Sequence, residues 1–233
     1  MLLDAGNAWK YDYGLAESTR GRVIVDGMNR MGYDAMALAA DEVNLGMDIL
    51  KERLAEAEFA VLSTNVVFEA TGDPFLAPSI IREMGGHHIA IIGITSPTVK
   101  MLLDGRQTGL TVVDPLPAIQ SAVESLRDQA GIIIILSNLG AETDEKLAIE
   151  IPEIDVIIGG QNGKIFIPPL RPREDGAIIA QAGSLGKQIG VLTLDFNGAG
   201  DLIAYAEEIR DLPEEVPPDQ EMVEWLQTYR IPE

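Results

Sequence analysis

The chain has 233 residues, 46% of them hydrophobic and 23% charged, a composition that allows a sizeable core and excludes a disordered protein. Its 37 acidic residues against 17 basic ones give a formal charge of −20, which repels phosphate backbones and anionic lipid surfaces and argues against nucleic acid polymers as partners. The lack of cysteine excludes disulfides, thiolate nucleophiles and zinc sites built on sulfur.

No window approaches the roughly 18 consecutive apolar residues that a membrane span requires, so we expect no membrane insertion. The start of the chain has no basic region and places Asp4 within its first apolar run, unlike a signal peptide. We therefore expect a cytoplasmic location for the chain as written, or a periplasmic or extracellular one if it is a fragment of an exported precursor.

The first two thirds of the chain alternate between apolar runs and helical patterns. The runs are rich in Ile and Val and do not alternate with polar residues, which is typical of strands covered on both faces. They lie at 2–5, 34–38, 59–63, 89–94, 131–136 and 155–160. Helical spacing of apolar residues predicts helices over 15–31, 46–57 and 115–130, the last with Asp114 as N-cap and Pro115 at its first position.

After residue 163 the pattern changes to short alternating segments separated by Pro and Gly, at 164–167, 177–183 and 189–196, and these predict antiparallel strands. Residues 211–219 form a linker rich in proline and acidic residues, and 221–230 are expected to form a terminal amphipathic helix. A βαβ first part followed by an antiparallel second part predicts an α/β domain with two sheets.

Four of the predicted strands run into glycine-bearing loops, where an open α/β sheet places its ligands. The loops carry polar side chains and no histidine, and we expect these side chains to converge: Asn7, Asp41, Asn138, Gln161 and Asn162. They form either a remodelled, oxygen-rich pocket or a decayed site whose polar groups hydrogen-bond one another. The second is favoured, because only Asp41 and Glu42 supply carboxylates nearby and hard cations bind more tightly as ligand charge rises.

The two histidines, His87 and His88, lie just before the apolar run at 89–94 and outside these four loops. Adjacent side chains on an extended segment point to opposite faces, so the pair cannot easily chelate one ion. We expect a structural or surface role for both.

Several stretches, taken in chain order, resemble motifs of the metallophosphoesterase (calcineurin-like) domain of the 5′-nucleotidase and UDP-sugar hydrolase family. LLDAGNAW (2–9) is similar to LLDAGDxF, MGYDAMALAADEVNLG (31–46) to MGYDAMALGNHEFDYG, and LSNLG (136–140) to LSHLG. DVIIGGQNG (155–163) is similar to DVIIGGHTH, and QAGSLGKQIGVLTLDF (181–196) to QAGxxGxxLGxLxL. The resemblance covers almost the whole chain and implies a four-layer αββα sandwich with two mixed sheets.

The resemblance also implies that the metal ligands have largely been replaced. Active members use two divalent metals that bridge an attacking water. The bridging aspartate of the family corresponds to Asn7, the histidine of LSHLG to Asn138, and the first histidine of GHTH to Gln161. The remaining correspondences are an asparagine ligand to Ala40, the second GHTH histidine to Gly163, and a transition-state histidine to Asp41. Glu42 keeps a position that supports the loop by hydrogen bonding.

The resemblance divides the chain into a metallophosphoesterase-like domain over 1–210 and a linker with a terminal helix over 211–233. It implies that the family's first strand, with an Asp-x-His ligand pair, is missing before residue 2, and that no C-terminal substrate-binding domain is present. The missing strand would leave an open sheet edge beside residues 2–5. We expect a second copy or another chain, a rearranged piece of this chain, or upstream residues to cover it, and the acidic surface favours a homodimer.

The resulting hypothesis is a catalytically impaired member of the family that acts in binding or assembly, without a cofactor, and with only Asp41 as a candidate catalytic residue. The alternative is an active hydrolase of small phosphate esters of the nucleotide type. It would use Mn, Zn, Fe, Mg or Ca in an unusual set, or ligands from an upstream segment.

Overall fold

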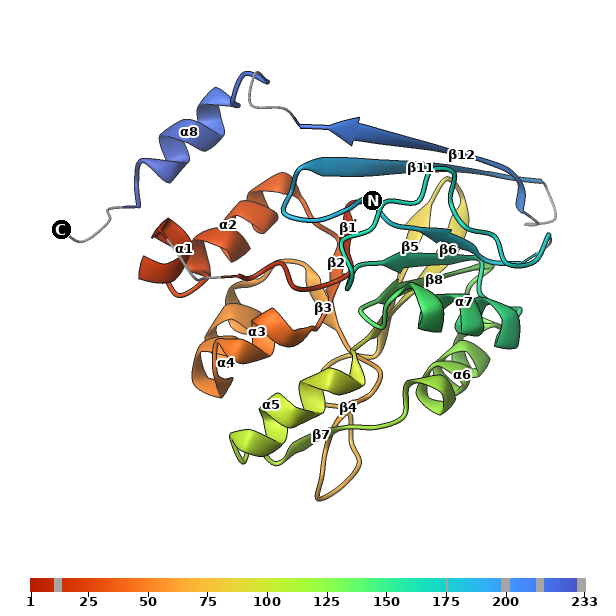
Figure 1. Ribbon diagram of the computed structural model, residues 1–233, viewed down its shortest axis with the longest axis horizontal. Helices are drawn as coiled ribbons and strands as arrows, with labels where there is room; N and C mark the ends of the chain where they lie inside the picture. Colours follow the sequence, from red (N-terminus) through yellow and green to blue (C-terminus); the bar gives the residue numbers. More distant parts are fainter. Residues whose placement is uncertain (11–13, 175, 198–201, 213–215, 230–233) are drawn as a thin grey trace.

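Two β-sheets lie face to face at the centre of the molecule (Figure 1), which is a computed structural model that describes residues 1–10, 14–174, 176–197, 202–212 and 216–229. One sheet has the parallel order β1-β2-β3. The other has the order β10-β9-β8-β6-β5, in which only β5 is antiparallel to its neighbour. The strands are β1 Leu3–Asp4, β2 Ala35–Ala37, β3 Ala60–Leu62, β5 Ser79–Met84, β6 His87–Ile94, β8 Ile132–Ser137, β9 Val156–Gly159 and β10 Ile178–Ala180.

Helices cover the outer face of each sheet. Against the three-stranded sheet pack α2 Arg22–Met31, α3 Ala40–Asn44, α4 Met47–Glu56 and α5 Lys100–Gly105. Against the five-stranded sheet pack α6 Pro115–Leu126 and α7 Ala141–Glu150. A short helix α1 Gly14–Ser18, a 3-10 turn Pro97–Val99 and a two-stranded ribbon of β4 Val66–Phe68 and β7 Leu110–Val112 complete this part of the fold.

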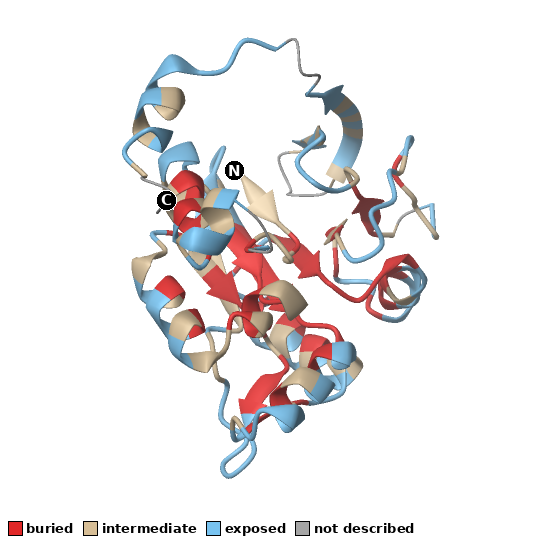
Figure 2. Ribbon diagram, turned by 60° about the vertical axis from the view of Figure 1, so that its left-hand side comes forward, coloured by how far each residue is buried: buried red, intermediate tan, exposed pale blue. Residues whose placement is uncertain are grey.

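Strand β8 shows why the sequence has unbroken apolar runs. Ile133 and Ile135 pack against α6 and α7, whereas Ile132 and Ile134 pack between the two sheets. Since successive side chains of a strand point to opposite faces, a strand in an inner layer needs apolar residues at every position. Figure 2 shows these strands as a buried centre with exposed residues on the outer helical surfaces. The predicted αββα sandwich is confirmed, with a mixed five-stranded sheet and a parallel three-stranded one.

The six predicted strands between residues 2 and 160 are all present, and Asp114 caps α6 by accepting a hydrogen bond from the Leu116 amide at 3.1 Å. The helix predicted over 15–31 is interrupted, because Arg20 and Gly21 adopt the left-handed conformation with φ of 49° and 78°. Helix α1 therefore ends at Ser18, and α2 begins at Arg22.

The part after residue 163 differs most from the prediction. Residues 164–167 form only an isolated bridge between Ile165 and Ala182, because the prolines that follow have no backbone N–H with which to extend a ladder. The segment predicted over 177–183 contains β10, which is parallel to β9 and not antiparallel. The prediction over 189–196 is confirmed by β11 Gln188–Phe196, which pairs with an unpredicted strand, β12 Leu202–Asp211, in an antiparallel hairpin.

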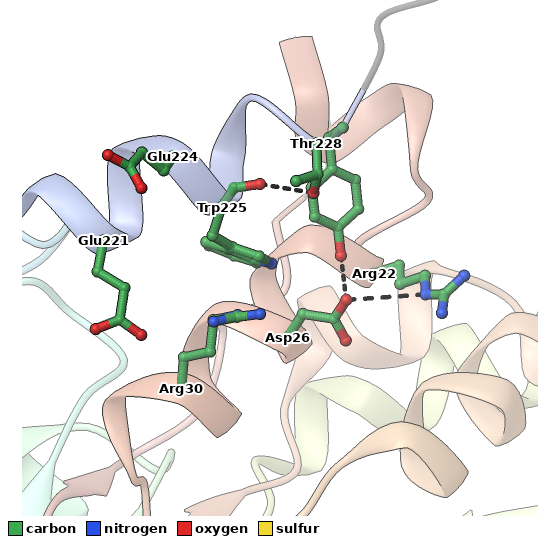
Figure 3. A pocket seen from close by; sticks show the side chains of 8 residues that line it. Arg22, Asp26, Arg30, Glu221, Glu224, Trp225 and Thr228 are labelled. Carbon is green, nitrogen blue, oxygen red and sulfur yellow. Dashed lines mark hydrogen bonds and ion pairs between the residues drawn. The ribbon is translucent and has the colours of Figure 1, made fainter.

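A last helix, α8 Gln220–Leu226, docks on α2 (Figure 3). It is shorter than the predicted 221–230; residue 230, like 213–215 of the predicted linker, lies outside the described residues. The Trp225 ring covers Gly27, at 3.4 Å from where a Cβ would stand, and Arg30 stacks on the ring at 5.0 Å. The Tyr229 hydroxyl donates to Asp26, and a cleft of about 590 Å³ lies between the two helices. No helix among the described residues is both long and apolar enough to cross a membrane.

Candidate functional site

The loops that follow β1, β2, β6, β8 and β9 meet at one end of the sandwich. The Asn138 amide after β8 donates to the Ala5 carbonyl after β1 at 3.1 Å. Gly160, after β9, approaches Ala5 so closely that a Cβ on Gly160 would lie 2.7 Å from the Ala5 Cβ. Four of the five side chains that we expected to converge, Asn7, Asp41, Asn138 and Gln161, lie on these packed loops.

Asn7 and Asp41 are joined through the backbone. The Asn7 Oδ1 accepts a hydrogen bond from the Asp41 amide at 3.0 Å, in the first turn of α3. Asn7 has a φ of 63°, a left-handed conformation that asparagine adopts more readily than most residues. The Asn7 amide oxygen therefore satisfies a backbone N–H group at the N-terminus of α3. The Asp41 side chain is partly exposed.

Asn138 and Gln161 are also hydrogen-bonded to other parts of the protein, although Gln161 is exposed. Asn138 is 2% exposed and uses its Nδ2 on the Ala5 carbonyl. Gln161 donates from Nε2 to the Ser96 Oγ at 3.1 Å, and its Oε1 lies 2.8 Å from where a Cβ of Gly140 would stand. The three amide side chains thus tie the loops to one another.

Glu42 is fully buried and organises the first two loops. Its Oε1 accepts hydrogen bonds from the amides of Ala8 and Trp9, at 2.8 and 3.0 Å. Its Oε2 accepts from the amides of Asn7 and Ala39, at 3.1 and 3.0 Å. Burial raises the pKa of Glu42 to about 7, while the amides of Trp9 and Asn7 act in the opposite direction. These bonds confirm the loop-supporting role predicted for this residue.

Asn162 does not join the other candidates. Its Oδ1 accepts hydrogen bonds from the Lys164 amide at 3.2 Å and from the Gln181 Nε2 at 2.6 Å, so it faces the segment after β10. The two histidines lie at the start of β6, whereas the residues that follow the other end of this strand, Thr95 and Ser96, face the site. The ring of His87 lies 5.2 Å from the ring of Phe196, as expected for a structural role.

Our sequence reasoning did not identify several buried polar side chains near the site. Ser63 and Thr95 share a hydrogen bond of 2.8 Å, and Asn65 donates to the Thr95 carbonyl at 2.9 Å. Asp4 accepts from the Gly6 amide at 2.7 Å, and burial raises the pKa of its carboxyl group. The only signal in the sequence was polar residues directly after apolar runs, a pattern that also fits ordinary loops.

The donor chemistry of the site is therefore dominated by neutral amides and hydroxyls. Among the residues that the structure describes, no three histidine, aspartate or glutamate side chains gather in an arrangement that would hold a metal ion.

Comparison with known proteins places this arrangement in context, although no family model matches the chain. A probable 5′-nucleotidase of Treponema pallidum is 31% identical over 224 residues, covering 86% of this chain and 37% of that protein. The crystal structure of a 5′-nucleotidase precursor from Thermus thermophilus superposes with a TM-score of 0.86 at 30% identity, over 97% of this chain and 48% of that one. The chain belongs to the 5′-nucleotidase-like metallophosphoesterase family.

A second solved structure is also similar to this chain. Sulfate thiohydrolase SoxB of Thermus thermophilus, in complex with glycerol, superposes with a TM-score of 0.90 at 26% identity, covering 98% of this chain and 42% of that one. This chain spans less than half the length of the first curated relatives that it matches.

Proposed function

We propose that this chain is a catalytically impaired member of the 5′-nucleotidase-like metallophosphoesterase family that acts in binding or assembly. One observation carries the proposal: the side chains at three positions that correspond to family metal ligands are amides, and all three are hydrogen-bonded within the protein. Asn7 binds the Asp41 amide, Asn138 binds the Ala5 carbonyl, and Gln161 binds Ser96.

The charges at the site support the same reading. Amide oxygens carry no formal charge, and a dinuclear metal centre needs several anionic or imidazole ligands. Both oxygens of Glu42 are engaged with backbone amides, and one oxygen of Asp4 accepts from Gly6. The described residues therefore fit a dinuclear metal centre poorly.

The metal content of the purified chain tests this directly. We expect well under one tightly held Mn, Fe or Zn ion per chain after dialysis, measured by elemental analysis. Two equivalents retained would contradict the proposal and support the alternative, an active hydrolase with Mn, Zn, Fe, Mg or Ca in an unusual ligand set.

Phosphatase assays distinguish a catalytically impaired protein from an active phosphoester hydrolase. Without a metal-activated water, phosphomonoester hydrolysis loses its nucleophile and much of its transition-state stabilisation. We expect no measurable release of phosphate from nucleotides at neutral pH with added Mn, Mg or Ca. Activity that Asp41→Ala abolishes, while Asp48→Ala on exposed α4 leaves it intact, would show that Asp41 is catalytic and that small phosphate esters are substrates.

The assembly role rests on the edge of the three-stranded sheet. Strand β1 lies at the end of that sheet and pairs only with β2 among the described strands, and Leu3 packs at the margin of the core between the sheets. An open edge with apolar residues below it pairs readily with another strand, and the acidic surface disfavours indiscriminate association. We infer that a further segment covers this edge, from a second copy, from another chain, or from a rearranged or upstream part of this protein, and a second copy is the favoured one.

Light scattering with hydrogen exchange tests the edge. A dimer whose amides at residues 2–5 exchange slowly supports assembly, and a monomer in which they exchange fast contradicts it. As to the compartment, the Thermus relative is a 5′-nucleotidase precursor, which supports the alternative of an exported protein.

A further inference from the structure

Two buried oxygen atoms, one from Asp144 and one from Gln181, lie beside Gly159. Asp144 is fully buried and Gln181 is 2% exposed. The Asp144 Oδ2 and the Gln181 Oε1 have no hydrogen-bond partner among the described residues. They lie 3.0 and 3.1 Å from the point where Gly159 would carry a Cβ, so both flank the space that this glycine leaves open. Two acceptors without a donor in a dry interior are costly.

The orientation of the Gln181 amide follows from its neighbours. The Lys164 backbone N–H can only donate, so the Asn162 atom that it meets at 3.2 Å is the oxygen Oδ1. The same Oδ1 lies 2.6 Å from Gln181, whose atom there must therefore be the nitrogen Nε2. The remaining Gln181 atom, which like Asp144 Oδ2 lies beside Gly159, is then the oxygen. Turning the Gln181 amide over would place Nε2 beside Asp144 Oδ2, but it would also bring the Gln181 oxygen against the Asn162 oxygen, two acceptors with no proton between them.

The other Asp144 oxygen already has a donor. The Ser137 hydroxyl donates to Oδ1, and the Ser137 oxygen accepts from the Leu139 amide at 3.1 Å, so Ser137 uses both its donor and one of its lone pairs. A bound metal cation would need about six oxygen ligands, and the pair offers two. A bridging water would satisfy both oxygens but would leave an ionised carboxylate without a positive partner.

We propose that Asp144 is a neutral carboxylic acid in the folded protein and donates its Oδ2 proton to Gln181 Oε1. The hydrogen bond made by this proton connects helix α7 to the segment after β10. The hydrogen bond from Gln181 to Asn162 extends the connection to the loop of residues 159–164. This loop carries Gln161, so Asp144 acts as a positioning residue for one side of the candidate site. The four residues Ser137, Asp144, Gln181 and Asn162 form what we call the proton clasp.

The electrostatic surroundings favour this state. Burial raises the pKa of Asp144 to about 7; the Ser137 hydrogen bond lowers it and the nearby Glu145 charge raises it. The side chains that face Asp144 from β8 and from the segment after β10, Ser137 and Gln181, are neutral. On α7 itself, Lys146 is exposed and paired with Glu142 at 3.0 Å.

Carbon-13 NMR of the full chain, with labelled and sequentially assigned aspartate carboxyl groups, tests the protonation of Asp144 without any substitution. We expect the Asp144 carboxyl signal to titrate near pH 7. A midpoint at or below pH 4 would overturn the proposal and would indicate an ionised carboxylate with a bridging water.

Hydrogen exchange tests the clasp itself. In the unsubstituted chain, protection of the amides at 159–164, corrected for intrinsic rates, is expected to fall by up to about tenfold per pH unit as the pH rises to about 7 and to level off above it, because the proton is then lost from both the closed and the open state. Asp144→Asn supplies a permanent donor in place of the proton and is expected to keep the protection at pH 8. Glu150→Gln, at the exposed end of α7, removes a charge that does not act on Asp144; it is the matched control and should follow the unsubstituted chain closely. Equal pH dependence in Asp144→Asn and the unsubstituted chain would overturn the proposal.

Discussion

Two buried carboxyl groups on opposite sides of the sandwich share a pKa of about 7 and reach it in different surroundings. Glu42, on the side of the three-stranded sheet, receives four backbone N–H donors. Asp144, on the side of the five-stranded sheet, receives one hydroxyl donor and keeps one oxygen without a donor. The two acids thus differ in the number of donors around them and not in their pKa, and the neutral state proposed for Asp144 follows from its missing donor.

The difference has a direct consequence for substitution. An amide in place of Glu42 would turn an N–H₂ group toward two backbone donors, whichever way it is oriented. An amide in place of Asp144 would turn the same group toward an acceptor, Gln181 Oε1. One chemical change is therefore expected to have opposite results at the two sites.

The largest effect is expected from this matched pair. Glu42→Gln should lower the free energy of unfolding by about 2–5 kcal/mol, because two backbone N–H groups lose their acceptor and meet a new donor. Asp144→Asn, measured by urea unfolding at the same pH of 6, should stay within about 0.5 kcal/mol of the unsubstituted chain. Similar losses at both sites would remove the distinction between the two acids.

The pH dependence of stability is expected to show the next largest effect. The pKa of Asp144 is raised from 3.8 in the unfolded chain to about 7. The stabilisation is therefore complete below pH 3.8 and is lost as pH rises through 7, by a few kcal/mol at about 1.4 kcal/mol per pH unit. Glu42, raised from 4.5, contributes with the same sign. Urea unfolding between pH 5 and 8 should show a shallower fall for Asp144→Asn; an unchanged slope would contradict the role of Asp144.

A smaller effect is expected from filling the space beside the two oxygens of Asp144 and Gln181. A Cβ on Gly159 would stand 3.0 Å from Asp144 Oδ2 and 3.1 Å from Gln181 Oε1. We expect Gly159→Ala to cost about 1–3 kcal/mol by thermal unfolding, because the proton clasp must widen. Gly131→Ala is the control, since a Cβ there meets nothing within 4 Å and should change stability by less than about 0.5 kcal/mol.

The smallest loss of stability is expected from substituting Asn7, whose backbone amide donates to Glu42. Asn7→Ala removes the oxygen that receives the Asp41 amide and places alanine at a φ of 63°, so we expect a loss of about 1–2 kcal/mol. Asn7→Gly tolerates that φ and should lose less in the same denaturant titration. If the two variants were equally destabilised, the backbone conformation at Asn7 would carry no strain.

The sequence predicted the inner strands well and the last third of the chain poorly. Ile132 and Ile133 read as a buried strand because both faces of β8 are covered, so the local pattern and the tertiary structure agree. Strand β12 was missed because its alternating residues are exposed or half-buried and include several acids, so its sequence resembles a hydrated loop. Its pairing with β11 is a contact between segments that no local pattern encodes.

The candidate site divides in the same way. Asn7, Asn138 and Gln161 could be selected because they stand at strand ends within recognisable motifs. Asp144 could not, because it lies inside α7, where an aspartate ordinarily faces solvent. Its burial depends on Gln181 and Gly159, which reach it from other strands. A single sequence gives no sign of such a three-way contact.

The docking of α8 on α2 gives the protein two intrinsic fluorophores with separate surroundings. Trp9 is fully buried in the core beneath the three-stranded sheet, whereas Trp225 is half-buried between Gly27 and the Arg30 guanidinium. These are the two tryptophans of the chain. Emission from Trp225 therefore reports on whether α8 is seated, and emission from Trp9 reports on the core, so loss of the helix and loss of the fold can be followed as two optical signals in one sample.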